Sequence, residues 1–177
     1  THDLAAFTAM NLVIATGVVP HMTLATAIVA FSANMIGGLA PDLDQPTASL
    51  WHRIRAGSFF SRLITPFLGG HRFLSHSIIG IILFGFAVSF ILYWASSFLL
   101  VDMGIVFYAF MIGFISHLLL DTITKDGVPW LFPIPWRMGL PPVKRLRIKT
   151  GGIIEQLIIF PGLVCLNGFL YYRFYHT

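Results

Sequence analysis

Five groups of ionisable residues stand at the ends of the apolar segments of this chain. They are His2 with Asp3, Asp42 with Asp44, His71 with Arg72 and His76, His117 with Asp121, and Glu155. The first, third and fifth groups open an apolar segment, whereas the second and fourth close one. Imidazole and carboxylate in combination suit zinc, manganese or iron better than calcium or copper.

This alternation has a geometric consequence if the apolar segments cross a membrane up and down. Every group then reaches the same face of the bilayer, so residues far apart in sequence can share one pocket. Eight side chains are candidate metal ligands: His2, Asp42, Asp44, His71, His76, His117, Asp121 and Glu155. That is more than one ion needs, and two or three ions are expected.

Taken singly, most of these groups have a simpler explanation. His117 and Asp121 are four residues apart and share a helix face, where they could grip an ion or form a buried hydrogen bond. Asp42 and Asp44 repel each other unless a cation is near, but they could also lie in a solvated loop. Only the joint placement of the groups favours metal binding.

The remaining groups are also ambiguous. His2 could be a disordered chain end, and Glu155 could be a favourable charge at a helix N-terminus. His71 is expected in the turn before a helix and His76 in its first turn. Arg72 could bind a phosphate oxygen through its planar guanidinium or could mark the cytoplasmic side. Ser75 or Ser77 could cap the helix that follows.

The composition indicates the environment in which these groups act. Of 177 residues, 56% are hydrophobic and 10% are charged, and the mean hydropathy is +0.82. Soluble domains carry about 25% charged residues. We therefore expect a single membrane-embedded domain over residues 1–177, an all-α polytopic bundle of about five helices. The net charge of +4 is read as a topology signal rather than as a nucleic-acid interface.

Apolar length and helix-stop residues place the five helices. The expected ranges are 4–18, 23–39, 77–98, 104–121 and 153–172, with Pro41 ending the second. The second half of 45–70 has the spacing of an amphipathic interfacial helix. The segment 122–151 holds five prolines together with Trp130 and Trp136, which predicts a loop at headgroup depth. Cys165, the only cysteine, is expected to pack between helices.

The basic residues predict the orientation. On the side of the polar groups lie Arg53, Arg55, Arg62, Arg72, Lys125, Arg137, Lys144, Arg145, Arg147 and Lys149, whereas only Arg173 lies on the other. Cytoplasmic loops of membrane proteins are rich in Lys and Arg. The polar groups are therefore expected to face the cytoplasm from a bacterial inner membrane.

The order of these motifs resembles a known family. The run Ala40-Pro41-Asp42-Leu43-Asp44, His71-Arg72 with His76-Ser77, His117 and Asp121 followed by Thr124 and Gly127, and the proline-rich stretch 128–141 are similar to the YdjM-like family. That family comprises bacterial inner-membrane proteins described as metal-dependent hydrolases. The chain more distantly resembles the zinc-dependent phospholipase C and single-strand nuclease superfamily, whose helical enzymes cleave phosphoesters with a zinc cluster. The likeness implies metal ligands at His2, Asp42, His71, His117, Asp121 and Glu155, with Asp44 and His76 as ligands or their neighbours.

These features together predict a membrane-bound, metal-dependent hydrolase that cleaves a phosphoester of a lipid or lipid-linked substrate. Zinc is the preferred ion, with manganese or iron as alternatives. Asp42 or Asp44 would take up a proton from water, and Arg72 would hold the phosphate. A metal transporter or sensor is an alternative, although 78–89 and 105–115 carry no ionisable residue. A noncatalytic scaffold stabilised by metal is another.

Overall fold

The computed structural model describes residues 1–44, 74–134 and 136–175, and this part of the chain is helical without strands. The elements are α1 (His2–Ala15), α2 (Leu24–Leu39), the 3₁₀ turn η1 (Ala40–Asp44), α5 (Ile78–Ala95), α6 (Met103–Thr122), the 3₁₀ turn η2 (Lys144–Leu146), the π-helical turn η3 (Glu155–Ile159) and α7 (Phe160–Tyr175). The predicted fold class is confirmed, with five main helices. The predicted interfacial helix within 45–70 lies outside the described residues.

Four segments in the described part of the chain are long and apolar enough to cross a bilayer. They are Leu24–Leu43, Ile78–Ala95, Met103–Thr122 and Glu155–Phe174, whereas the apolar helix α1 is shorter. Twenty helical residues span about 30 Å, the thickness of the hydrocarbon core. Helix starts follow local capping, because the side chains of Thr23, Ser77 and Asp102 accept hydrogen bonds from backbone N–H groups three residues later.

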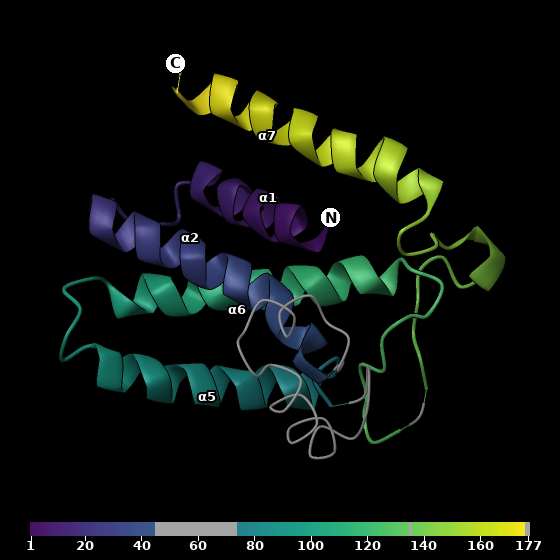
Figure 1. The fold of residues 1–177 in the computed structure, drawn as a ribbon, viewed down its shortest axis with the longest axis horizontal. Coiled ribbons are helices and arrows are strands. Elements are labelled where there is room, and N and C mark those ends of the chain that lie inside the picture. Colours follow the sequence, from purple (N-terminus) through teal and green to yellow (C-terminus); the bar gives the residue numbers. More distant parts are fainter. Residues whose placement is uncertain (45–73, 135, 176–177) are drawn as a thin grey trace, which may run out of the picture.

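Helix α6 is the centre of the bundle (Figure 1). Helices α1 and α2 pack on one side of α6, α5 packs on the other, and α7 lies outermost against α1. The apolar core forms along α6, where Phe110, Phe114 and Leu118 are buried. Helix α7 is mostly exposed, as expected for a surface that faces lipid; Cys165 is among its exposed residues rather than packed between helices.

Small residues let α2 and α6 approach main chain to main chain. A side chain on Gly37 would collide with the backbone oxygen of Phe110, and one on Gly113 would collide with that of Asn34. At the same crossing the Asn34 side-chain amide donates to Ala109 O at 3.0 Å. Close contact of small residues with an interhelical hydrogen bond is a common way to join helices in a membrane. It also fixes the relative height of the two helices.

A second polar contact joins α1 to α7. Asn11 Nδ2 donates to Asn167 Oδ1 at 2.9 Å, and Asn167 Nδ2 lies 2.6 Å from Thr8 Oγ1. These residues are partly buried between two otherwise apolar helices. In a bilayer, where water cannot satisfy the amides, the pair gives α1 and α7 a preferred register.

The connection between α6 and α7 is irregular, as its prolines predict, and it is pinned to the end of α6. The Leu140 N–H donates to Thr122 O at 2.8 Å, and the Ile148 N–H donates to Ile123 O at 3.1 Å. Trp130 turns inward, where its indole N–H donates to Thr122 Oγ1 at 3.1 Å. Trp136 is exposed. The two tryptophans therefore differ, although both were expected at headgroup depth.

Candidate metal centre

His117 and Asp121 lie one helical turn apart near the end of α6, and both side chains are buried. Their spacing places them on one face of the helix, so that His117 Nε2 and Asp121 Oδ2 are 3.7 Å apart. That distance is too long for a hydrogen bond, which ends near 3.2 Å. The pair is therefore not the simple hydrogen bond that was the alternative explanation of this motif.

The main chain of α2 fixes the orientation of the His117 ring. His117 Nδ1 lies 2.6 Å from Gly38 O, and because a carbonyl oxygen only accepts, Nδ1 carries the proton. His117 Nε2 is buried and has no hydrogen-bond partner among the described residues. It instead faces two carboxylates, with Asp42 Oδ1 at 3.6 Å and Asp121 Oδ2 at 3.7 Å. Either a second proton on the ring or a metal cation would satisfy this arrangement.

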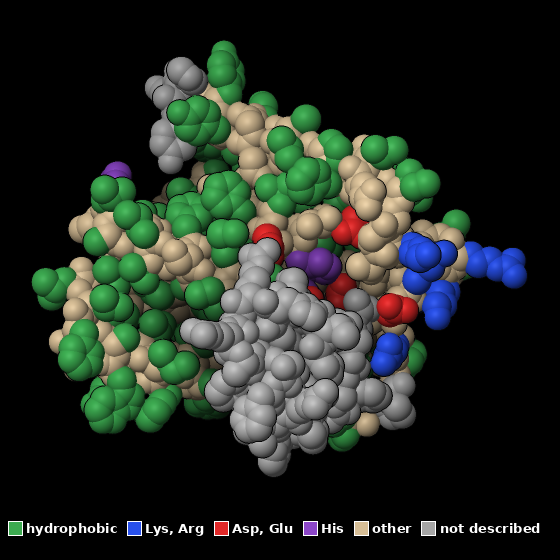
Figure 2. All heavy atoms as spheres, viewed as in Figure 1, with side chains coloured by type: hydrophobic (Ala, Val, Ile, Leu, Met, Phe, Trp, Pro, Cys, Tyr) green, Lys and Arg blue, Asp and Glu red, His purple; other side chains and the backbone are tan. Residues whose placement is uncertain are grey.

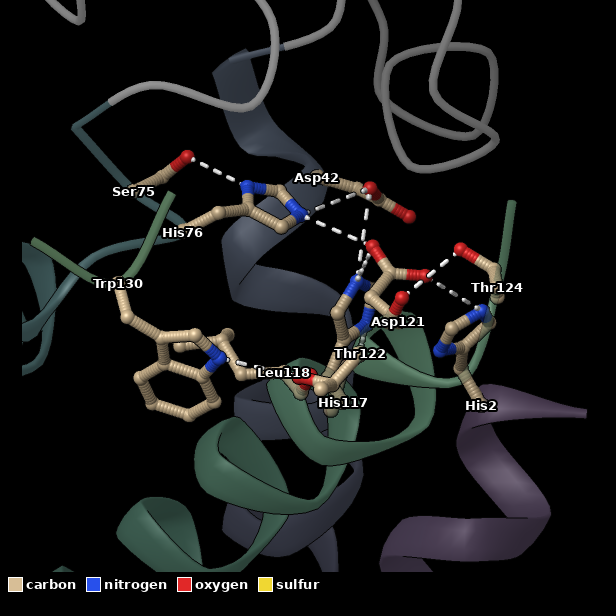
Figure 3. Close-up of polar contacts among 11 residues, drawn as sticks. His2, Asp42, Ser75, His76, His117, Leu118, Asp121, Thr122, Thr124 and Trp130 are labelled. Atoms are coloured by element: carbon tan, nitrogen blue, oxygen red, sulfur yellow. Dashed lines mark hydrogen bonds and ion pairs between the residues drawn. The ribbon is translucent and has the colours of Figure 1, made fainter. Parts of the chain in front are cut away.

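His76 enters the same site from the turn before α5. Its Nε2 lies 3.4 Å from Asp121 Oδ2 and 3.9 Å from Asp42 Oδ1, and the side chain is fully buried. Its other ring nitrogen, Nδ1, is 2.9 Å from Ser75 Oγ. Both histidines therefore present Nε2 to the two carboxylates while Nδ1 contacts a polar group outside the site (Figure 3). Metal-binding histidines are commonly held in this way.

Four side chains form what we call the tetrad: Asp42, His76, His117 and Asp121. The distances from the Nε2 atoms of the two histidines to the nearest carboxylate oxygens of the two aspartates run from 3.4 to 3.9 Å. Atoms that bind a tetrahedral ion at about 2.0–2.1 Å are separated from one another by roughly 3.3 Å. The tetrad thus has the donor types and nearly the spacing of a zinc-like site. Its carboxylates also provide negative charge in a buried pocket, which a divalent cation would balance.

His2 extends the tetrad on the α1 side. Its ring stacks on His117 with the centroids 4.2 Å apart, and its Nε2 lies 3.7 Å from Asp121 Oδ1. His2, His117 and Asp121 bring ligand-type atoms within 4.8 Å of one another, as do Asp42, His76 and His117. The two oxygens of Asp121 therefore face different sets of histidines. His2 therefore packs against the site.

Glu155 lies near His2 but makes a different contact. It starts the π-helical turn before α7, and its Oε2 accepts a hydrogen bond from the Gly151 N–H at 2.7 Å. Gly151 has a φ of 72°, a conformation that favours glycine. Glu155 and His2 line a small cavity together with Thr124. The role of Glu155 as a metal ligand stays a prediction.

The structure thus brings five of the eight predicted ligands to one end of the bundle: the tetrad and His2. Asp44 ends η1, but its side chain is outside the described part of the structure. His71 and Arg72 also lie outside it. Sequence reasoning missed the Gly38 carbonyl, because a backbone acceptor has no signature in a sequence. It considered Ser75 only as a cap, although its position next to His76 was a usable signal.

Comparison with known proteins places this sequence in a family. The chain matches the family described as YdjM inner membrane protein over residues 1–174. YvsG of Bacillus subtilis (strain 168), named an uncharacterized protein, is 28% identical over 145 residues, which cover 82% of this chain and 79% of YvsG. The inner membrane protein YdjM of Escherichia coli (strain K12) is 31% identical over 120 residues, covering 68% of this chain and 56% of that protein. YdjM of Shigella flexneri matches to the same extent.

No solved structure is significantly similar to this chain. The family match covers nearly the whole sequence, and it agrees with the four segments that are able to span a membrane. The chain therefore belongs to the YdjM inner membrane protein family and is a protein of the inner membrane.

Proposed function

We propose that this protein is a membrane-bound, metal-dependent hydrolase that cleaves a phosphoester of a lipid or lipid-linked substrate at the cytoplasmic face. The observation that carries the proposal is the tetrad, where two histidines and two aspartates meet at the ends of membrane-spanning helices. Zinc fits these donors best, and manganese or iron are alternatives. His2 provides a further nitrogen for a second ion beside Asp121.

A divalent ion in the tetrad would supply Lewis acidity, which activates water and stabilises negative charge on phosphoryl oxygens. The residues of the tetrad would bind the ion and accept a proton. His117 and His76 would hold the ion through Nε2, because Gly38 O and Ser75 Oγ contact their Nδ1 atoms. Asp42 is the accessible member of the tetrad, with 32% of its side chain exposed, and is placed to accept a proton from water.

The location of the tetrad favours a substrate that comes from the bilayer. The tetrad lies where α6 ends, and a 20-residue span puts that end at the membrane interface. A phosphate group of a membrane lipid lies at this depth, while its hydrocarbon chains stay beside the exposed apolar faces of the helices. Described basic residues near this end, such as Lys125 and Lys149, support a cytoplasmic orientation and a preference for anionic groups.

The test is turnover by the purified protein with a known metal content. The wild type is assayed for phosphate or headgroup release from phospholipids and prenyl phosphates, beside Asp121→Ala and the control Asp102→Asn. Asp102 caps the other end of α6, and asparagine preserves that cap. Turnover by the wild type and the control, but not by Asp121→Ala, is expected. Equal turnover by all three would refute the proposal.

A structural metal site is the second candidate, and one observation favours it. Three members of the tetrad are almost fully buried, and an ion with four protein ligands has a closed coordination sphere, as structural zinc sites do. In that case the ion joins α2, α5 and α6 without reacting. Chelation would then lower the unfolding temperature, while no phosphoester in the screen would be cleaved.

A further inference from the structure

Residues 140–149, which we call the basic loop, combine exposed cations with exposed apolar side chains. Leu140, Val143 and Leu146 are 60%, 55% and 70% exposed. Lys144, Arg145 and Lys149 are exposed between and after them. None of these three cations makes an ion pair within the described residues. In Figure 2 the Lys and Arg side chains gather at one edge of the molecule, beside the acidic and histidine side chains.

Backbone hydrogen bonds keep the two ends of the basic loop close to the membrane surface. The Lys125 N–H donates to Ile148 O at 2.9 Å, and the Leu140 N–H donates to Thr122 O at 2.8 Å. These bonds attach both ends of the loop to the C-terminal end of α6, a membrane-spanning segment. Because the hydrocarbon core is about 30 Å thick and α6 has the length to cross it, this end lies in the headgroup region.

Arg147 holds the loop in shape from within. Its Nε donates to Pro141 O at 2.8 Å and its Nη2 donates to Pro142 O at 3.1 Å. Its guanidinium also lies against Gly139, where an added side chain would have to displace it. Arg147 is thereby engaged inside the loop, whereas Lys144, Arg145 and Lys149 remain available to an external partner.

We propose that the basic loop is a docking surface for the headgroups of anionic phospholipids in the surrounding membrane. The cations would contact the phosphate groups, and Val143 and Leu146 would enter the boundary between headgroups and acyl chains. Interleaved apolar residues distinguish this surface from one that binds a soluble anion, because a soluble anion offers no apolar phase to receive them. The proposal does not depend on the tetrad or on the proposed hydrolase activity.

The experiment measures the depth of a spin label on the loop. Cys165 is the only cysteine, so Cys165→Ala gives a background in which Leu146→Cys can be labelled alone. The full chain is placed in nanodiscs of phosphatidylcholine, with or without phosphatidylglycerol. Collision rates with oxygen and with a water-soluble nickel chelate then report depth. We expect a loss of nickel accessibility when phosphatidylglycerol is present, and a partial return at high salt.

Two controls make the result specific. Lys144→Gln, Arg145→Gln and Lys149→Gln together should abolish the effect of phosphatidylglycerol, whereas Arg173→Gln near the other end of the bundle should not. A label at Leu100, which is 98% exposed at that other end, should be insensitive to the change in lipid. The proposal fails if the Leu146 label is equally accessible to nickel in both lipid mixtures, a comparison that needs no charge variant. It also fails if the triple variant behaves like the wild type.

Discussion

The ring of His117 on α6 is oriented by the backbone carbonyl of Gly38 on α2, with His117 Nδ1 and Gly38 O 2.6 Å apart. This contact depends on the close approach of the two helices, because Gly38 leaves room for its neighbours and Gly113 lies against the Asn34 carbonyl. Helix packing and the direction of a candidate metal ligand are therefore one structural feature.

Asp121→Asn should remove bound metal. Asp121 lies within 3.7 Å of both His76 Nε2 and His117 Nε2, and the substitution keeps its shape but removes its charge. Metal affinity should fall by at least about 10–100-fold, the usual loss when only an outer partner of a ligand is removed. Elemental analysis of the purified protein measures the effect. Asp102→Asn makes the same charge change at the other end of α6 and should retain the metal; equal metal in both variants would contradict the assignment.

Two neighbouring serines should have separable roles. Ser75 Oγ lies 2.9 Å from His76 Nδ1, so Ser75→Ala should weaken metal affinity by about 10–100-fold. Ser77 Oγ accepts the Gly80 N–H at 3.1 Å as the cap of α5, so Ser77→Ala should cost about 0.5–2 kcal/mol of stability. Metal titration and unfolding of both variants in detergent measure the two effects. The distinction is lost if Ser77→Ala weakens metal binding as much as Ser75→Ala does.

Gly113→Ala should separate α2 from α6. A side chain there collides with Asn34 O, and overpacking of this kind costs about 1–3 kcal/mol. The movement should also lengthen the contact between His117 and Gly38, so metal affinity should fall together with the unfolding temperature. The matched control is Gly168→Ala on α7, where nothing lies within 4 Å and alanine should leave both properties unchanged or raise helix stability. Equal behaviour of the two variants would argue against the tight crossing.

Asn11 and Asn167 should be energetically coupled. Each single change to leucine removes the 2.9 Å hydrogen bond between α1 and α7, and such bonds in membranes average about 0.6 kcal/mol. The double variant should lose less stability than the sum of the two single variants, by roughly that amount. Unfolding of all four proteins in one detergent gives the coupling. Strict additivity would mean that the amides do not interact.

The sequence predicted the five helices because their apolar length and capping residues are local properties. Pro41 ended the second helix as expected, and the start of α5 follows from Ser77. The first helix was predicted to begin at residue 4, but it begins at His2, because the Ala5 N–H donates to Thr1 O. The π-helical turn at Glu155 was not predictable, since its hydrogen-bond pattern leaves no periodic signal.

Helix polarity alone predicted that the tetrad and His2 would lie at one end of the bundle, and this needs no knowledge of packing. The sequence could not predict which atoms of these side chains face one another. These contacts depend on how far α2 slides along α6, and that is decided by the fit of Gly37 and Gly113 against the opposite main chain. Likewise, the partnership of Asn11 and Asn167 joins residues 156 positions apart, and the sequence offers many alternative partners for each amide.

His2, Asp42, His76 and His117 come from four different parts of the chain, yet all of them meet at one end of the bundle. An ion there would hold these segments together at one leaflet, while at the far end α2 and α6 are joined by packing and by the hydrogen bond from the Asp102 N–H to Thr26 Oγ1. A change in bilayer thickness would then alter the spacing of the helices at the end opposite the tetrad. The end that holds the tetrad would stay unchanged.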